Sequence, residues 1–224
     1  MNACLRVGSV TELSGQALPV RTWMSEAELA RLAAMQSAQR AAQFVAGRWL
    51  ARVLLADAFG GARQDWTLSD GADAPPEVCG PAPAFLSLSH TGDRIACAVS
   101  DQPIGIDLER CRPRKGLDDL MRAITTEAER ARLATANPLQ AFAEVWTLKE
   151  AWLKRRGGGL FATMLGHAVA VHPAARPDEA DACTWSTDDL VLALCADELA
   201  AVTARGMQAP CYWRMVPAGT APLE

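Results

Sequence analysis

Two carboxylates in the segment GIDLER have the spacing of ligands on one face of a β-strand. Asp107 and Glu109 are two residues apart, so a strand projects both to the same side as Gly105. Ile106 and Leu108 then project to the other side, towards a core. Such a pair suits Mg²⁺, which prefers oxygen ligands and takes only one or two protein carboxylates. For an isolated D-x-E, an acidic edge strand that faces solvent is the simpler interpretation.

The segment WTLKEAWLK places an acid and a base on one face of a helix. At about 100° per residue, Trp146, Glu150 and Lys154 lie within about 80° of one another. An i,i+4 salt bridge beside an amphipathic core stripe explains the same spacing, and Lys149 could equally be a solvated helix lysine. The glycines at 157–159 either cap this helix or let the backbone approach a ligand.

His90 follows the predicted strand SLS and precedes the turn-forming residues Thr91-Gly92-Asp93. At this position its side chain can point into a cleft. A lone histidine is nevertheless more often an ordinary turn residue. None of these three sets identifies a functional site by itself.

Hydrophobic spacing predicts the helices and strands that would position these residues. Helices are predicted at 22–35, 37–59, 117–133 and 138–155, and strands at 85–89, 94–100, 104–108, 168–172, 190–195 and 200–204. Ser25 and Glu28 form a candidate capping box for the first helix. The Gly-, Pro- and Asp-rich run 69–83 is predicted as a loop.

The order helix, strands, helix, strands predicts an α+β fold. Two comparable halves, residues 1–100 and 101–224, would meet near Ser100. No residue-level repeat relates the two halves.

Composition excludes several classes of protein. The 224 residues are 50% hydrophobic, enough to bury a core, and the formal net charge of −4 argues against a general nucleic-acid binder. Seven cysteines without a C-x-x-C pair suggest neither zinc nor a disulfide framework, so a reducing cytoplasm is expected. The N-terminus does not resemble a signal peptide and no apolar run is long enough for a membrane span, so a soluble protein without a membrane partner is predicted.

Considered together, the three segments are far more specific than each is alone. SLSHTGD, GIDLER and WTLKEAWLKRRGGGL, in this order and spacing, resemble the 4′-phosphopantetheinyl transferases of the surfactin-synthetase-activating type. The resemblance extends over roughly residues 20 to 165. It implies two similar α+β halves related by a pseudo-two-fold axis, with coenzyme A in the cleft between them.

The resemblance also implies roles for the acidic and basic residues. Asp107, Glu109 and Glu150 would hold Mg²⁺ at the pyrophosphate of coenzyme A, and Lys154 would neutralise an α-phosphate oxygen. Glu150 is the first candidate for the base that deprotonates the attacking serine. A metal-bound water held by Asp107 or Glu109 is the second.

Further residues would bind the nucleotide of coenzyme A. Ser89 and His90 would meet its 3′-phosphate end, Arg31 would make a second contact, and Lys149 would orient the pyrophosphate or the base. Relatives usually carry G-K-P before the S-H pair, where this chain has Ala74-Pro75-Pro76. A neighbouring arginine could replace the lost lysine.

The implied activity transfers the 4′-phosphopantetheine arm from coenzyme A to a serine of a carrier protein and releases 3′,5′-ADP. The partner would be an acyl, peptidyl or aryl carrier protein of fatty-acid, polyketide or nonribosomal-peptide synthesis, and the enzyme is expected to be a monomer. The basic run 110–115 could meet an acidic helix of the carrier, or could be a solvated loop.

Two other functions compete with this one. The missing lysine favours a non-catalytic protein that binds coenzyme A or a carrier, although a full set of acidic and basic residues argues against it. A magnesium-dependent nucleotide hydrolase is disfavoured, because the sequence has no G-x-x-x-x-G-K-S/T phosphate loop.

Overall fold

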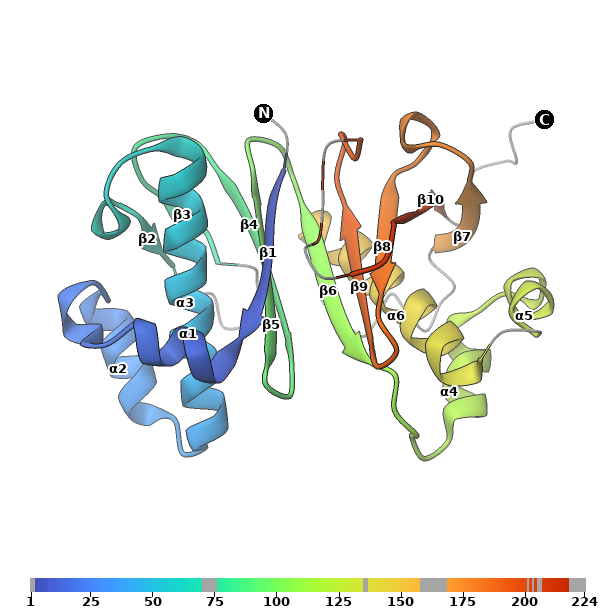
Figure 1. Cartoon of the computed structure of the whole chain (residues 1–224), viewed down its shortest axis with the longest axis horizontal. Coiled ribbons are helices and arrows are strands. Elements are labelled where there is room, and N and C mark those ends of the chain that lie inside the picture. The colour runs from blue at the N-terminus through green and yellow to red at the C-terminus, as the bar shows by residue number, and fades with distance from the viewer. Residues whose placement is uncertain are drawn as a thin grey trace.

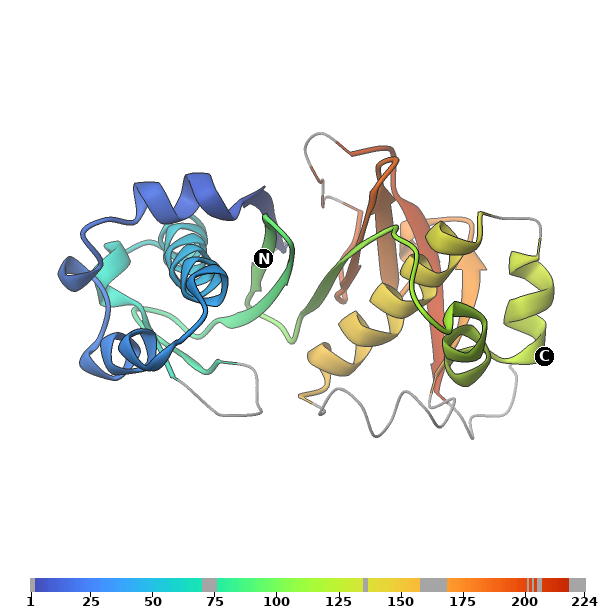
Figure 2. The same cartoon turned by 90° about the horizontal axis from the view of Figure 1, so that it is seen from below.

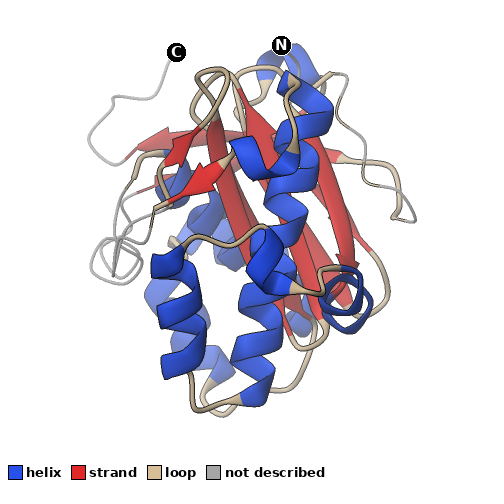
Figure 3. Cartoon of the chain, turned by 90° about the vertical axis from the view of Figure 1, so that its left-hand side faces the viewer, coloured by secondary structure: helices blue, strands red, loops and turns tan. Residues whose placement is uncertain are grey.

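The structure is a computed structural model that describes residues 3–69, 76–134, 137–157, 169–200, 202, 204 and 207–217. In this part of the chain, helices pack on antiparallel sheets, which confirms the predicted α+β class (Figure 3). Ala74 and Pro75 of the altered segment, and Gly158 and Gly159 after the predicted helix, lie outside the described residues.

The N-terminal helices are α1 (Val10–Gln16), α2 (Glu26–Ala34) and α3 (Ala38–Phe59). Helices α2 and α3 were predicted, whereas α1 was not. The capping box of α2 is confirmed, since Ser25 Oγ accepts from the Glu28 amide and the Glu28 carboxylate accepts from the Ser25 amide. Gly60, with a φ of +82°, ends α3.

A three-stranded antiparallel sheet in the order β1-β5-β4 accompanies these helices. Its strands are β1 (Cys4–Ser9), β4 (Phe85–Thr91) and β5 (Arg94–Ser100). His90 lies on β4 opposite Ile95 and not in the turn, because Gly92, with a φ of +57°, makes a tighter hairpin than predicted. Among the described residues of the predicted loop 69–83, Val78–Cys79 form a short strand, β3, which pairs with β2 (Thr67–Leu68).

The second large sheet has the strand order β6-β9-β8-β10-β7. Its strands are β6 (Gly105–Arg110), β7 (Val169–Ala174), β8 (Ala182–Ser186), β9 (Leu190–Cys195) and β10 (Cys211–Pro217). The strand predicted at 200–204 is wrong for the residues described there, and β8 and β10 were not predicted.

The C-terminal helices are α4 (Leu117–Ile124), α5 (Glu127–Leu133) and α6 (Pro138–Arg155). The single helix predicted at 117–133 is therefore two. Thr126 interrupts the predicted helix because it begins α5 with a capping box. Its hydroxyl accepts a hydrogen bond from the Glu129 amide, and the Glu129 carboxylate accepts one from the Thr126 amide. No helix among the described residues is long and apolar enough to cross a membrane.

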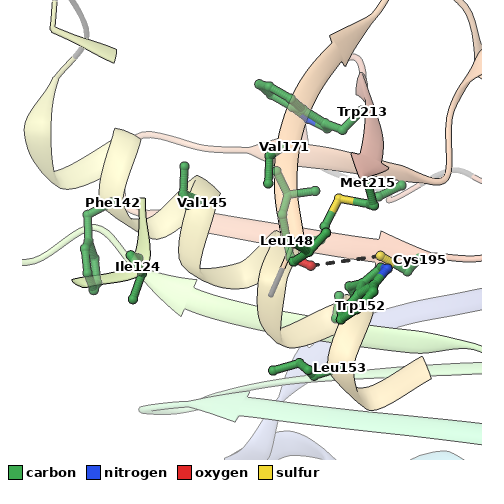
Figure 4. Packing of buried hydrophobic residues seen from close by; sticks show 14 residues of the cluster. Ile124, Phe142, Val145, Leu148, Trp152, Leu153, Val171, Cys195, Trp213 and Met215 are labelled. Atoms are coloured by element: carbon green, nitrogen blue, oxygen red, sulfur yellow. Dashed lines mark hydrogen bonds between the residues drawn. The ribbon is translucent and has the colours of Figure 1, made fainter. Parts of the chain in front are cut away.

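Apolar contacts stack these elements in layers, visible in Figures 1 and 2. Helix α3 packs on one face of the first sheet, and the other face of that sheet packs against the second sheet through small residues such as Ala96 and Ala98. Helix α6 covers the far face of the second sheet, where Leu148 and Trp152 point towards Cys195 and Met215 (Figure 4).

Strand β6 lies at the centre of this arrangement. Ile106 and Leu108 are buried between the sheets, as the alternation predicted. Gly105 touches α6 so closely that a Cβ built on it would lie 1.9 Å from the Ala151 carbonyl oxygen. This contact brings the carboxylate face of β6 against the last turns of α6.

Candidate functional site

Asp107 is the point at which β4, β6 and α6 meet. Its Oδ1 accepts hydrogen bonds from Lys154 Nζ on α6 and from Ser89 Oγ on β4, both at 2.7 Å. Lys154 Nζ also donates to the Ile106 carbonyl at 3.1 Å. The structure thus brings together three residues that were predicted to act at one site, from segments far apart in sequence.

Glu150 lies one helical turn before Lys154 and is 3% exposed. Its Oε2 is buried and has no hydrogen-bond partner among the described residues. The pKa of Glu150 is raised to about 7, chiefly by desolvation and then by the charge of Asp107; Glu109 adds to the increase and Lys154 opposes it. A carboxyl group in this environment can gain or lose a proton near neutral pH.

We expect Glu150 to make the metal-free protein less stable as the pH rises. Its folded-state pKa of about 7 lies above the ordinary value of 4.5, so the stabilising contribution is complete below about pH 4.5 and is lost as the pH rises through 7. Glu150→Gln should therefore unfold at a higher temperature than the wild type at pH 8, with the difference vanishing towards pH 5. Thermal unfolding in a chelating buffer measures this, and a pH-independent difference would contradict it.

Glu109 has partners of its own. Its carboxylate forms an ion pair with Arg114 at 2.7 Å and accepts from Thr91 Oγ1 at 3.4 Å. As the side chains stand, no three Asp, Glu, His or Cys groups in the described part of the chain are placed to hold a metal ion. The donor chemistry still fits a hard cation, because Glu150 keeps a buried unpaired oxygen beside two other carboxylates.

A basic pocket of about 320 Å³ is lined by residues in or next to α2, α3, β4 and β5. Arg31 and His90, both predicted to bind the nucleotide, line it together with Arg40, Arg48 and Phe44. The guanidinium groups of Arg31 and Arg48 lie 5.3 and 5.1 Å from the centre of the Phe44 ring. Such a pocket can accept an anionic group with a planar base.

His90 connects the pocket with the Asp107 cluster. Although much of its side chain is exposed, partial desolvation lowers its pKa, the charges of Lys154 and Arg40 lower it further, and Asp107 opposes them. Arg40 was not identified from the sequence. It lines the same pocket as His90 and lowers the pKa of that histidine by its charge.

Lys149 has other contacts than those predicted. It is 1% exposed, and its ammonium group donates to the Ile124 carbonyl and lies 3.3 Å from Glu129 Oε2. Glu129 in turn accepts from the Val171 amide at 2.8 Å. Lys149 therefore ties α6 to α5 and β7, and its predicted contact with a pyrophosphate stays untested.

Comparison with known proteins relates this chain to one enzyme family, and the matched residues include β6 and α6. Residues 103–206 match the family model of the 4′-phosphopantetheinyl transferase superfamily. The chain is 36% identical over 157 residues to the 4′-phosphopantetheinyl transferase AcpT of Salmonella typhimurium, which covers 68% of this chain and 73% of that protein. It is 32% identical over 91 residues to the 4′-phosphopantetheinyl transferase Sfp of Bacillus subtilis, 40% of either chain.

Among solved structures, a holo-(acyl-carrier-protein) synthase from Bacillus anthracis in complex with CoA (3′,5′-ADP) aligns with 43% of this chain and 91% of its own, with 17% identity and a TM-score of 0.39. The sequence relationships are the stronger finding. On their extent and identity, this chain belongs to the 4′-phosphopantetheinyl transferase superfamily.

Proposed function

We propose that this enzyme transfers the 4′-phosphopantetheine group of coenzyme A to a serine of an apo carrier protein and releases 3′,5′-ADP. One observation carries the proposal: His90 lines a pocket with three arginines and lies within electrostatic reach of Asp107 and Lys154, which form a cluster with Glu150. An anionic nucleotide and the phosphate that reacts can therefore be bound side by side.

The pocket suits the nucleotide half of coenzyme A. Arg31, Arg40 and His90 offer donors to its phosphates, and guanidinium groups bind phosphate with strong, directional hydrogen bonds. Lys154 pairs with Asp107 and lines a second pocket, of about 420 Å³, and there it would meet the pyrophosphate. Arg40 would then supply the charge that relatives take from the G-K-P lysine.

Asp107, Glu109 and Glu150 would hold Mg²⁺, with Glu109 released from Arg114. The support is the unpaired buried oxygen of Glu150 and its raised pKa, which results first from burial and then from repulsion by Asp107 and Glu109. When bound, the ion would neutralise the charge of the pyrophosphate.

The reaction forms a bond between the carrier serine oxygen and the β-phosphorus, and it breaks the bond from that phosphorus to the oxygen that leaves with 3′,5′-ADP. Glu150 would accept the serine proton, since a base with a pKa near the working pH is the most effective. Lys154 would stabilise the charge that develops on the phosphate oxygens. A water held by Asp107 or Glu109 remains the alternative base.

We also propose the finer assignments. The enzyme would be of the surfactin-synthetase-activating type, with its two halves formed by residues 1–100 and 101–224, so that the boundary follows β5 of the first sheet. Its partner would be an acyl, peptidyl or aryl carrier protein, with the run 110–115 as a candidate contact. It would act in the cytoplasm as a monomer.

The test is a mass measurement on the carrier protein. Incubation with coenzyme A, Mg²⁺ and an apo carrier should add the mass of phosphopantetheine to one serine. A non-catalytic binder would leave the carrier unchanged, and a nucleotide hydrolase would consume coenzyme A without a carrier. Either result would contradict the proposal.

Arg40→Ala should weaken coenzyme A binding by about tenfold, because it removes a charged donor from the nucleotide pocket. Titration calorimetry with coenzyme A and with its 3′-dephospho form measures the effect, which should be smaller for the dephospho form if Arg40 meets the 3′-phosphate. Arg21→Ala is the matched control, since Arg21 is exposed and does not line the pocket. Equal affinity for Arg40→Ala and the control would remove Arg40 from the site.

A further inference from the structure

The hydroxyl group of Ser89 donates a hydrogen bond to the Asp107 carboxylate. We propose that Ser89 is a positioning residue that fixes the orientation of the Asp107 carboxylate, and not a ligand of the nucleotide. This inference rests on the proposed function, because it assigns Asp107 to magnesium and coenzyme A.

Alternate residues of β4 present hydroxyl groups to β6. Ser87 Oγ accepts from the Ile106 amide at 2.9 Å, Ser89 Oγ accepts from the Leu108 amide at 3.1 Å, and Thr91 Oγ1 contacts the Glu109 carboxylate. β6 is the outermost strand of its sheet. The serine oxygens therefore take the place that the carbonyls of a neighbouring strand would have, and they join the two sheets.

The hydroxyl of Ser89 has a second bond that Ser87 lacks. A serine hydroxyl has one proton to donate and two lone pairs to accept. Ser89 accepts from the Leu108 amide and donates its proton to Asp107 Oδ1 at 2.7 Å. While that bond exists, Ser89 has no proton to offer to a phosphate oxygen, and the residue is only 7% exposed.

The geometry at Asp107 explains what this bond would do. Both of its side-chain hydrogen bonds among the described residues, from Ser89 and Lys154, end on Oδ1. Two donors from different elements fix the plane of the carboxylate, and Oδ2 is the oxygen that remains for a cation. Without Ser89 the carboxylate would keep only Lys154, a long side chain that must also serve the substrate.

The experiment compares Ser89→Ala with Ser87→Ala. Each variant leaves one buried β6 amide without its acceptor, so both should lose similar stability. Only Ser89→Ala also frees Asp107. We expect it to raise the magnesium concentration needed for half-maximal coenzyme A binding by roughly tenfold to a hundredfold, whereas Ser87→Ala should stay within about twofold of the wild type. Ser89→Thr, which keeps the hydroxyl, should restore the wild-type value.

Binding of 3′,5′-ADP without magnesium separates the two roles of Ser89. A positioning residue predicts an unchanged affinity in Ser89→Ala, so a loss there that magnesium does not influence would overturn the proposal in favour of a nucleotide contact. Equal magnesium requirements in the two alanine variants would also overturn it. A wild-type protein without magnesium-dependent coenzyme A binding would overturn this proposal together with the proposed function, and so differs from a failure confined to Ser89.

Discussion

Glu150→Gln is expected to slow single-turnover transfer by about 10²- to 10⁴-fold at neutral pH, as is typical when a general base is lost. Glutamine keeps the shape and one acceptor oxygen but cannot take up a proton. Rapid-quench measurements at saturating coenzyme A and carrier, with calorimetry at several magnesium concentrations, give the rate and the binding separately.

The two roles of Glu150 predict different results. A base produces a slow variant that still binds coenzyme A in a magnesium-dependent way. A residue that only holds the ion produces a binding defect that excess magnesium partly relieves by mass action. Normal binding with a normal rate would remove Glu150 from the mechanism and leave the ion to Asp107 and Glu109.

Glu144→Gln is the matched control. Glu144 is a half-buried carboxyl on the same helix, its pKa is also raised by burial, and it bonds to Thr184, away from Asp107. The rate of this variant should stay within about twofold of the wild type. A large loss would mean that removing any partly buried carboxylate from α6 disturbs catalysis.

Local signals in the sequence were sufficient for most helices. Ser25 and Glu28 form the capping box that marks the start of α2, and Gly60 ends α3. The same signal at Thr126 and Glu129 divides the predicted helix 117–133, and it was present in the sequence as T-x-x-E. Strands β8 and β10 have no comparable end signals, and tertiary pairing decides where they form.

Residue spacing also predicted that Asp107 and Glu109 share one face of their strand and that Glu150 and Lys154 share one face of their helix. It could not predict that these faces meet, because Asp107 and Lys154 are joined by a contact between distant segments. Only the resemblance to a family supplied that pairing. The spacing of Lys149 argued against its place in the same site, because it precedes Glu150 by one residue and so lies about 100° away around the helix. In the structure its ammonium group is buried against Glu129.

The serines of β4 show a further limit. LSLS, residues 86–89, alternates as a strand with one polar face does, and a solvated face is the ordinary interpretation. In the structure this face meets β6 instead, and Ser87 and Ser89 are both buried. The two serines bind β6 of the second sheet, and the position of that sheet cannot be predicted from the local sequence of β4.

Gly105→Ala is expected to lower the free energy of unfolding by about 3 kcal/mol or more, at the upper end of the range for overpacking. The added Cβ would lie 1.9 Å from the Ala151 carbonyl oxygen and 2.6 Å from the Arg155 amide nitrogen. Both are backbone atoms of α6 and cannot rotate away. The helix must therefore move from β6, which also separates Lys154 from Asp107, so the transfer rate should fall together with stability.

Gly15→Ala is the control with the opposite sign. Gly15 lies in α1, and no atom lies within 4 Å of the Cβ that alanine would add. This substitution should therefore stabilise the protein, or leave it unchanged, by removing the flexibility of a helical glycine. Urea denaturation of both variants, followed by transfer assays on the folded fraction, measures the two effects.

If Gly105→Ala unfolded at the wild-type urea concentration, the close contact between β6 and α6 that assembles the site would be wrong. If instead it were destabilised but kept a normal rate when folded, the Asp107–Lys154 pair would not be needed for transfer.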